Sequence, residues 1–585
     1  MRLIFSYLKK YRWAVVLTMI LKLVGTFVEL LLPYILEHLV DNIAPTKSIP
    51  HVLFWGAIML ALSFLIRFLN ITANRRAVKT SSLAAYEVRR DLFWHSVNLS
   101  GNQMDEFGLP SLTSRMTSDS YNVQDFMRMF QSIGIRAPFL LLGGIIVTLS
   151  MDPGLGAILC IMTPIAIVVI VSVSVKGIPL YSKVQQSVDS ITRVMRENIT
   201  GIRVVKALSK EKYEINRFTG VNEEMARRER TATITMSLPG PIMTLMLNIG
   251  LTLVVYVGAV RVNNGLTEPG VILAFLTYFN MILMGVMGLS RVFLVMSKAN
   301  ASANRIAAVI HTEEELTPIP EEEAASTDSD AYIVFDNVSF RYGQDEDTGN
   351  SGFAGEERQM SLSNISFSMK KGESLGIIGP TGCGKTSIIN LLMRFYDTTQ
   401  GHVFIDGKDV RTYNKDDLHR KFGVVFQNDV IFADTLAENI SFGRELTEEA
   451  MRYAAADARA AEFIEAYDDD YRHMASIRGA NLSGGQRQRV LITRALAANP
   501  DILVLDDASS ALDYKTDAAL RKAIHEHHSN TTTIIVAQRV SSIMNSSRIL
   551  VMDEGRIIGQ GTHEELLLSC PQYREIHKTQ MGEEG

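Results

Sequence analysis

A glycine-rich stretch from Gly379 to Thr386, GPTGCGKT, constrains the fold of this chain more than any other feature. Its spacing, G-x-x-x-x-G-K-T, is that of a loop that wraps around phosphate groups. An apolar strand pattern over 374–378 precedes the loop and helical periodicity over 387–396 follows it, so the motif has the flanking elements that it needs. Backbone N–H groups at the glycines and at the helix N-terminus can then bind phosphate. The stretch predicts a nucleoside triphosphate ligand.

Two side chains at the end of this loop have specific expected roles. Lys385 can place its charge beside the β- and γ-phosphates, and the Thr386 hydroxyl can bind Mg2+. A glycine turn without a ligand would leave Lys385 unexplained, so a binding loop is the better interpretation. The other residues expected to contact the nucleotide here are Gly379, Pro380, Thr381, Gly382, Cys383, Gly384 and Ser387.

The chain is 47% hydrophobic, which is high for a wholly soluble protein. About 20 residues of helix suffice to cross the hydrocarbon core of a bilayer. Six apolar stretches of about this length or longer lie at 13–43, 52–73, 132–150, 155–175, 241–262 and 271–296. The sequence therefore predicts a multi-pass membrane protein with six transmembrane helices.

The distribution of Lys and Arg predicts how these helices are oriented. Both residues are frequent after the second and fourth apolar stretches, whereas the opposite loops near Lys47 and Asp152 contain few. This places the long connections, 74–131 and 176–239, and both termini in the cytosol, with the protein in the plasma or inner membrane. The connections have amphipathic helical patterns, so we expect helices that extend beyond the bilayer and end in turns that suit docking.

Charged residues inside the apolar stretches are costly and usually face a cavity or another charge. Lys22, Glu29 and Arg67 are the candidates. Helices one and two are expected to be antiparallel neighbours, and a rise of about 1.5 Å per residue gives Glu29 and Arg67 similar depths. The sequence thus predicts that Glu29 and Arg67 pair, either as a packing salt bridge or as a contact for a transported molecule.

A change in composition divides the chain. Residues 312–331 are rich in Glu, Pro, Ser and Asp, which is typical of a solvated linker. The expected fold is multidomain: an all-α transmembrane domain with long cytosolic extensions (1–311), the linker, and an α/β nucleotide-binding domain (332–585). Within the last domain, the acidic and glycine-rich segment 344–358 is expected to be a mobile loop.

Motifs further along the chain extend the predicted nucleotide site. An apolar strand pattern ends in Asp506 and Asp507, and such a strand can present Asp506 to Mg2+. Between the loop and this strand lies LSGGQ, which opens a helix whose N-terminus suits an anion. Its residues of interest are Ser483, Gly484, Gly485 and Gln486. Tyr342 could stack on adenine, although an isolated tyrosine is more often ordinary strand surface.

Taken together, these motifs make the chain resemble the ATP-binding cassette (ABC) exporters over nearly its whole length. The resemblance implies that LSGGQ is the signature motif, which completes the ATP site of a second cassette, so this half-sized chain needs a second chain. It also assigns Tyr342 to adenine stacking, Gln427 to contact with Mg2+ and the transmembrane domain, and Asp513 to the loop between cassettes. The segment 197–211 resembles the second of the family's coupling helices.

Three positions depart from the pattern of active ABC exporters. Asp507 stands where active members carry the Glu that polarises the attacking water, and Gln538 stands where they carry the switch His. The stretch 475–479 before the signature also lacks its usual Glu. The resemblance therefore implies the subunit with the degenerate site in a heterodimeric, multidrug-type exporter, with Asp507 and Gln538 at the altered catalytic positions.

The main hypothesis is an exporter subunit that uses ATP and Mg2+ to move amphipathic or hydrophobic small molecules out of the cytosol. Its partner would be a second half-transporter with an intact catalytic Glu and switch His. Alternatives are a non-transporting regulatory membrane protein that binds ATP and a homodimeric lipid or peptide exporter. The net charge of −5 gives no general attraction to nucleic acid, so we expect no nucleic-acid partner.

Overall fold

A computed structural model describes residues 1–327, 329–343 and 360–581. The predicted mobile loop at 344–358 lies outside these residues. Contacts divide the chain into unit 1, residues 1–97 with 110–312, and unit 2, residues 98–109 with 313–585. The domain limits taken from composition stay a prediction. The structure adds that a short segment between the second and third apolar stretches belongs by its contacts to unit 2.

Unit 1 is entirely helical, and the six predicted transmembrane helices are confirmed. Among the described residues, six helical stretches are long and apolar enough to cross a membrane. A short amphipathic helix, α1 (Arg2–Lys10), precedes them. The long helices are α2 (Arg12–His38), α3 (Ile49–Asn98), α6 (Ser120–Met151), α7 (Pro153–Thr200), α9 (Glu211–Ser237), α10 (Pro239–Asn263) and α11 (Pro269–Ile310). α9 and α10 together form one of the six stretches, Glu211–Asn263.

Small residues let the helices of unit 1 approach closely. At Gly285 of α11, a Cβ would lie 2.9 Å from the carbonyl oxygen of Ala137 on α6, so only glycine fits. At Gly250 of α10, a Cβ would lie 2.1 Å from the ring of Phe279. Small residues at helix interfaces are the usual means of packing where lipid removes the hydrophobic driving force. The buried centre of unit 1 therefore lies around α11, between α6 and α10.

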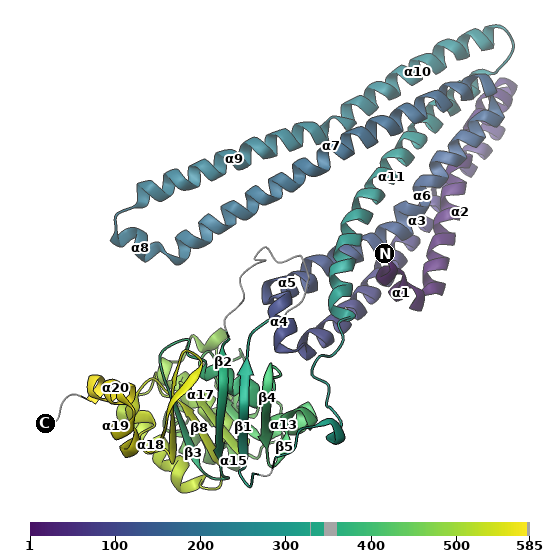
Figure 1. The fold of residues 1–585 in the computed structure, drawn as a ribbon. Coiled ribbons are helices and arrows are strands. Elements are labelled where there is room, and N and C mark those ends of the chain that lie inside the picture. The colour runs from purple at the N-terminus through teal and green to yellow at the C-terminus, as the bar shows by residue number, and fades with distance from the viewer. Residues whose placement is uncertain (328, 344–359, 582–585) are drawn as a thin grey trace. The chain divides into compact units, whose positions relative to one another are not determined.

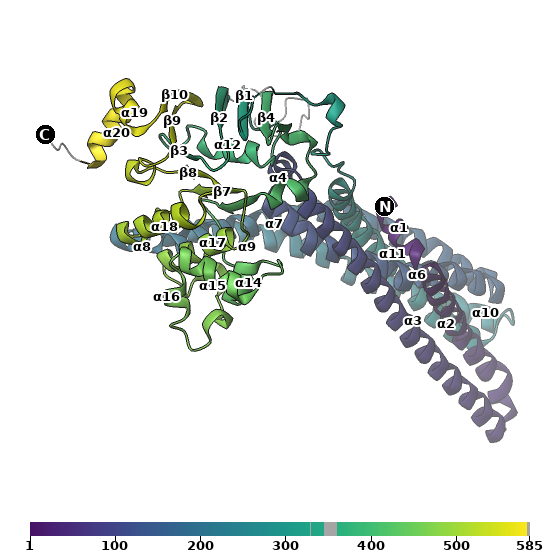
Figure 2. The same ribbon diagram turned by 90° about the horizontal axis from the view of Figure 1, so that it is seen from below.

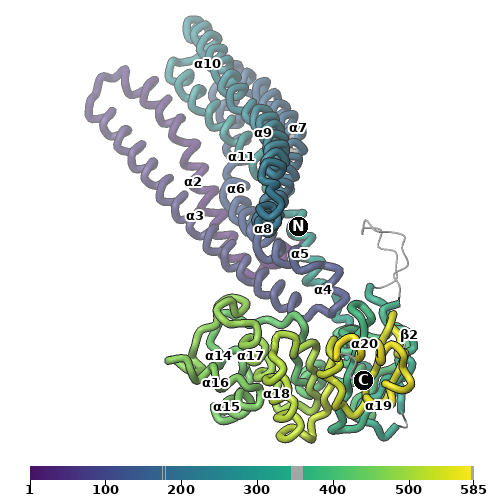
Figure 3. The backbone as a smooth tube through the Cα atoms, turned by 90° about the vertical axis from the view of Figure 1, so that its left-hand side faces the viewer, coloured from purple at the N-terminus to yellow at the C-terminus, as the bar shows by residue number. Residues whose placement is uncertain are grey.

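Several helices are much longer than a bilayer requires. α3 has 50 residues and α7 has 48, which at about 1.5 Å per residue gives more than twice the thickness of the hydrocarbon core. α7 and α9 run side by side and are joined at their far end by α8 (Ile202–Ala207) (Figures 1 and 3). The predicted extensions of the transmembrane helices are therefore present.

The predicted pair between Glu29 and Arg67 is wrong. Glu29 on α2 accepts two hydrogen bonds from Arg136 on α6, at 2.6 and 3.2 Å. Lys22 donates to Asn70 Oδ1 at 2.7 Å, and Arg67 is exposed on α3. The reason is that α2 packs mainly against α6 and α11, which brings Glu29 to α6 rather than to its neighbour in sequence. Matching depths along two helices cannot reveal that a third helix supplies the partner.

The Glu29 and Arg136 pair gives a direct test of this packing. Removal of either charge leaves the other in a poorly solvated position, so Glu29→Gln and Arg136→Gln should each destabilise the protein. The double variant should lose less than the sum, with a coupling of about 1 kcal/mol or more in a double-mutant cycle on thermal unfolding in lipid nanodiscs. Arg67→Gln combined with Glu29→Gln is the matched control, and additivity is expected there. Coupling of Glu29 to Arg67 instead would contradict the packing of α2.

The segment after α3 contacts the α/β part of unit 2. Helix α4 (Gly101–Phe107) begins at Ser100, whose side chain caps it, and ends at Gly108 with a positive φ of 71°. The amide of Gly101 donates to Phe395 O at 3.1 Å, and Tyr396 donates its hydroxyl hydrogen to Asp105 at 2.8 Å. A Cβ at Gly101 would lie 2.5 Å from the Tyr396 ring. The long connection after the second apolar stretch was expected to contain a turn suited to docking. It contains a short helix, α4, which packs on Phe395 and Tyr396.

The described residues of unit 2 form two sheets. The antiparallel sheet has the order β2-β1-β4-β5, and the larger, mainly parallel sheet has the order β10-β9-β3-β8-β7-β6, which Figure 2 shows from β10 to β7. Ile377 on the central strand is paired with Val536 on one side and Leu550 on the other. The strands are β1 (Ile333–Phe340), β2 (Leu362–Met369), β3 (Ser374–Ile378), β4 (Gln400–Ile405), β5 (Lys408–Asp409), β6 (Phe422–Val425), β7 (Ile502–Asp506), β8 (Thr532–Val536), β9 (Arg548–Asp553) and β10 (Arg556–Gly561).

Helices complete unit 2 and confirm the predicted α/β fold. α12 (Lys385–Leu392) follows β3 directly, in the place where a phosphate-binding loop needs a helix. The helices that come between β6 and β7 in the sequence form a separate cluster (Figure 3). Its members are α14 (Leu436–Ser441), α15 (Glu448–Asp457), α16 (Ala461–Ile464) and α17 (Gly484–Leu496). α18 (Tyr514–His527), α19 (His563–Ser569) and α20 (Pro571–Met581) follow.

Candidate nucleotide site

The glycine-rich loop lies at the carboxyl end of the central strand β3. Gly382 and Gly384 have φ values of 87° and 99°, which L side chains rarely adopt. At Gly384, which caps α12, a Cβ would also meet Ser361 O at 2.7 Å. Gly379 approaches the backbone so closely that a Cβ would lie 2.2 Å from Met552 O. The spacing of glycines in the motif is therefore explained by conformation and by close packing.

The ammonium group of Lys385 is held by the loop itself. It donates to Gly379 O at 2.9 Å and to Pro380 O at 2.7 Å, with Cys383 Sγ at 3.7 Å. Its charge therefore lies within the curve of the loop, beside the free N–H groups at the start of α12. Burial raises the pKa of the Cys383 thiol, and Lys385 partly opposes this. The thiol is therefore a packing group rather than a reactive thiolate.

Thr386 and Asp506 come together although 120 residues separate them in sequence. The Thr386 hydroxyl donates to Asp506 Oδ2 at 3.1 Å, from the first turn of α12 to the end of β7. Asp506 is 2% exposed, and this burial raises the pKa of its carboxyl, while the Thr386 hydroxyl acts in the opposite direction. A hydroxyl and a carboxylate oxygen side by side are the type of ligand that Mg2+ prefers.

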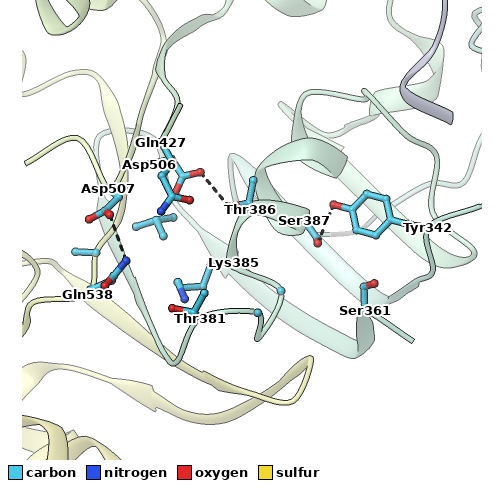
Figure 4. A pocket seen from close by; sticks show the side chains of 14 residues that line it. Tyr342, Ser361, Thr381, Lys385, Thr386, Ser387, Gln427, Asp506, Asp507 and Gln538 are labelled. Atoms are coloured by element: carbon cyan, nitrogen blue, oxygen red, sulfur yellow. Dashed lines mark hydrogen bonds between the residues drawn. The ribbon is translucent and has the colours of Figure 1, made fainter. Parts of the chain in front are cut away.

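Asp507 and Gln538 contact each other at the edge of the same pocket. Gln538 Nε2 donates to Asp507 Oδ2 at 3.2 Å (Figure 4). Asp507 has a φ of 53°, and its amide donates to Val536 O at 2.9 Å, which fixes the direction of its side chain. Burial raises the pKa of the Asp507 carboxyl, while the charges of Arg539 and Lys385 lower it. Both predicted catalytic positions therefore lie together, with the amide of one bound to the carboxyl of the other.

Tyr342 lies on the opposite wall of the pocket (Figure 4). Its hydroxyl is 3.0 Å from Ser387 Oγ and accepts from Asn390 Nδ2 at 3.2 Å. Its ring forms T-shaped contacts with the rings of Phe340 and Tyr396, with centroid distances of 4.7 and 5.1 Å. Tyr342 is therefore a fixed aromatic wall beside the phosphate-binding loop, at the place where a base would need one.

The pocket between these groups has a volume of about 270 Å3. Gln427, which follows β6, reaches it from the side of Asp506 (Figure 4). Sequence reasoning missed three lining residues, Ser361, Val536 and Ala537. Val536 and Ala537 come just before Gln538, so the altered switch position could have identified them. Ser361 follows a segment without any pattern, and nothing in the sequence connects it with the loop.

The signature residues lie away from this pocket, and none of them is among its lining residues. Ser483 caps α17 by accepting from the Gln486 amide at 3.2 Å, and the Gln486 side chain returns a bond to the Ser483 amide. Ser483 and Gly484 are exposed. Asp513 caps α18 nearby in the same way, with its carboxylate accepting from the Thr516 amide at 2.9 Å. Both N-termini are exposed and lie outside the lining of this chain's own pocket.

The residues of the pocket fit a nucleoside triphosphate with Mg2+. The N–H groups of the loop, the Lys385 charge, the Thr386 and Asp506 oxygens and the Tyr342 ring supply the donors, the metal ligands and the stacking face that such a ligand requires. At Gly382 a Cβ would meet nothing within 4 Å, so space remains over the loop. The arrangement can bind phosphate firmly, whereas its candidate general base is engaged with an amide.

Comparisons with family models match both units. The model described as ABC transporter transmembrane region matches residues 15–287, and the model described as ABC transporter matches residues 362–510. The second range contains the glycine-rich loop, the signature and both aspartates at the end of β7.

Comparisons with individual proteins cover nearly the full length. The chain is 32% identical over 581 residues to the uncharacterized ABC transporter ATP-binding protein YfiB of Bacillus subtilis, covering 99% of this chain and 98% of that protein. It is 31% identical over 554 residues to the ATP-dependent lipid A-core flippase of Desulfotalea psychrophila, covering 94% and 93%. A bacterial Atm1-family ABC exporter solved with ATP bound matches with a TM-score of 0.81 at 24% identity, over 98% and 99% of the chains, which shows the fold.

Proposed function

Since this chain is a member of the ABC transporter family, a multi-pass membrane protein whose ATPase is coupled to transport, we propose that it is the ATP-retaining half of a two-chain exporter. The observation that carries this proposal is the contact of Gln538 with Asp507 beside an intact Lys385. Groups that hold phosphate are present, but the groups that would activate water are replaced. The site therefore binds nucleotide better than it turns nucleotide over.

The residues of the pocket divide into three roles. Lys385 and the loop amides hold the β- and γ-phosphates, Tyr342 stacks on the base, and Thr386, Asp506 and Gln427 hold Mg2+ when it is bound. The Thr386 hydroxyl and the Asp506 carboxylate already lie 3.1 Å apart, so a cation can be accepted there without a large rearrangement. Mg2+ supplies positive charge that neutralises the phosphates.

The second chain follows from the position of the signature. Ser483 and Gly484 are exposed at the N-terminus of α17 and away from this chain's own pocket. A helix N-terminus binds anions, so the signature is complementary to a phosphate on another chain. We propose that this other chain carries an intact catalytic Glu and switch His, and that the site completed by the signature performs most of the hydrolysis.

The cargo that fits a membrane domain of this kind is an amphipathic or hydrophobic small molecule. The helices of unit 1 expose many large apolar side chains, such as Phe64 and Phe68 on α3 and Ile146 on α6. One of the relatives is named as a lipid A-core flippase, which supports lipid-like molecules as a class to test. The excess of Lys and Arg in the long connections favours an orientation with both termini in the cytosol.

Transport in sealed vesicles tests the proposal. The chain and the subunit that co-purifies with it are reconstituted, and accumulation of fluorescent amphipathic probes is followed after ATP is added. Accumulation should depend on ATP and be blocked by vanadate. Gly484→Asp should reduce it about 10-fold or more because a new negative charge would face the partner's phosphate, and the site has room, with the nearest atom 3.8 Å from a Cβ. ATP-dependent effects on a partner enzyme without any flux would instead favour a regulatory protein.

A further inference from the structure

Arg494, in the last turn of α17, is bound to the segment that follows Gln427. This segment, residues 428–433, is called the Gln427 loop below. Arg494 Nη1 lies 3.4 Å from Asp429 Oδ1, and Nη2 donates to Val430 O at 3.1 Å. The Arg494 side chain is only 12% exposed. A buried guanidinium therefore ties the end of α17 to the loop that directly follows Gln427, a residue of the nucleotide pocket.

The same guanidinium also binds the helix that follows the loop. Arg494 Nε donates to Asn439 O at 2.7 Å, and Nη2 donates to Asn439 Oδ1 at 3.2 Å. Asn439 in turn accepts from the Phe432 amide at 2.8 Å and donates to Phe432 O at 3.0 Å. The rings of Phe432 and Phe442 lie against the guanidinium, with centroids 6.0 and 5.1 Å from its carbon. Both ends of the Gln427 loop are thus fixed through one side chain.

Only arginine can make this set of contacts. Its planar fork presents donors in several fixed directions and stacks on aromatic rings, whereas lysine offers a single ammonium group. Burial lowers the pKa of Arg494 from its usual value, and Asp429 opposes this. A buried charge destabilises a protein unless its hydrogen bonds are made. Replacement of the guanidinium by an ammonium group keeps the charge but removes several of these bonds, so it should free the loop before it unfolds the domain.

The position of Arg494 on α17 connects two sites. α17 is a single helix of 13 residues, with Ser483 of the signature as its N-cap and Arg494 in its last turn. The Gln427 loop lies at one end of this helix and the signature at the other. Through Arg494, the segment after Gln427 is therefore tied to the helix that carries the signature.

We propose that Arg494 is a positioning residue. Through its bonds to the loop that follows Gln427, it holds Gln427 in the place from which Gln427 meets Mg2+ at this chain's site. The proposal rests on the proposed function, in which Gln427 contacts Mg2+.

The test measures how strongly Mg2+ improves ATP binding at this chain's site. The full chain with its co-purifying subunit is placed in lipid nanodiscs and labelled with 8-azido-ATP, with and without Mg2+, and labelled chains are separated by electrophoresis. Gln427→Ala should reduce the Mg2+ enhancement about 10-fold, as loss of groups around a metal commonly does. Arg494→Lys should reduce it in the same direction, with the Mg2+-free affinity unchanged. The double variant should lose no more than the larger single effect.

Arg444→Lys is the matched control. Arg444 donates to Ile440 O at 2.9 Å and to Arg494 O at 2.8 Å, so it joins the same two helices, but within the described part of the chain its hydrogen bonds do not reach the Gln427 loop. It should leave the Mg2+ enhancement unchanged. If Arg494→Lys does not fold, Asp429→Asn removes the ion pair alone and should show the same loss.

The outcomes separate the two proposals. If Gln427→Ala lowers the enhancement and both Arg494→Lys and Asp429→Asn behave like the Arg444 control, Arg494 has only a structural role and the inference is overturned. If Gln427→Ala itself has no effect, the assignment of Gln427 to Mg2+ is wrong, and the inference falls with it.

Discussion

Lys385→Ala is expected to weaken ATP binding at this chain's site by about 10- to 100-fold, the value of one or two hydrogen bonds to a charged group. The Lys385 ammonium lies within 2.9 Å of two loop carbonyl oxygens and supplies the compact positive charge of the pocket. Its removal should leave the loop folded, because the glycine conformations and the packing against Met552 do not depend on it. Labelling of this chain by 8-azido-ATP over a range of concentrations measures the change.

Lys371→Ala is the control for this experiment. Lys371 lies in the same unit, is 59% exposed and makes a surface contact of 3.6 Å with Asp501. Surface pairs of this kind contribute little, so labelling should be unchanged. Equal labelling of the Lys385 variant and the wild-type chain would show that the glycine-rich loop does not bind the phosphates.

Asp507→Glu combined with Gln538→His is expected to raise ATP hydrolysis at this site by about 100-fold. Asp is one methylene shorter than Glu, and a displacement of a catalytic group by about 1 Å can cost about 100-fold in rate. Gln538 donates a hydrogen bond of 3.2 Å from its amide to the Asp507 carboxyl group. Its amide can donate to a phosphate, but unlike histidine it cannot take up a proton near neutral pH. The short Asp507 side chain and the neutral Gln538 amide therefore both weaken activation of the water that attacks the γ-phosphate.

Single variants make this prediction specific. Asp507→Glu alone should give a partial gain, because the longer carboxylate still faces an amide, and Gln538→His alone should give little, because no carboxylate reaches the water. Release of phosphate is measured with the partner's catalytic residue removed, so that only this site reports. A double variant no faster than the wild-type chain would mean that these two residues do not limit hydrolysis here. Transport need not rise, since the proposed exporter works through one hydrolytic site.

The sequence was most informative where a function depends on a local backbone shape. The loop from Gly379 to Thr386 could be identified because phosphate binding requires glycines at fixed spacing between a strand and a helix, and the structure has both elements in place. The six transmembrane helices could be identified because a bilayer imposes length and polarity on each segment separately. Neither prediction needed any knowledge of which segments touch.

Contacts between distant segments were harder to predict from the sequence. Glu29 could not be matched to Arg136, because the choice between α3 and α6 depends on how the helices pack rather than on depth. Thr386 and Asp506 were each assigned to Mg2+ only because each residue belongs to a motif of known purpose, and their direct hydrogen bond was not predicted. The bonds of Arg494 to the Gln427 loop left no trace in the sequence, since arginine near a helix C-terminus is ordinary.

The most direct test of the asymmetry is the nucleotide found in each site after one turnover. The assembled pair in nanodiscs is given labelled Mg-ATP, trapped with vanadate after a single turnover, and the nucleotide bound to each chain is identified after crosslinking. We expect intact ATP beside Lys385 and ADP in the site that this chain's signature completes. ADP formed beside Lys385 as quickly as in the partner's site would contradict the proposal that this chain retains its ATP.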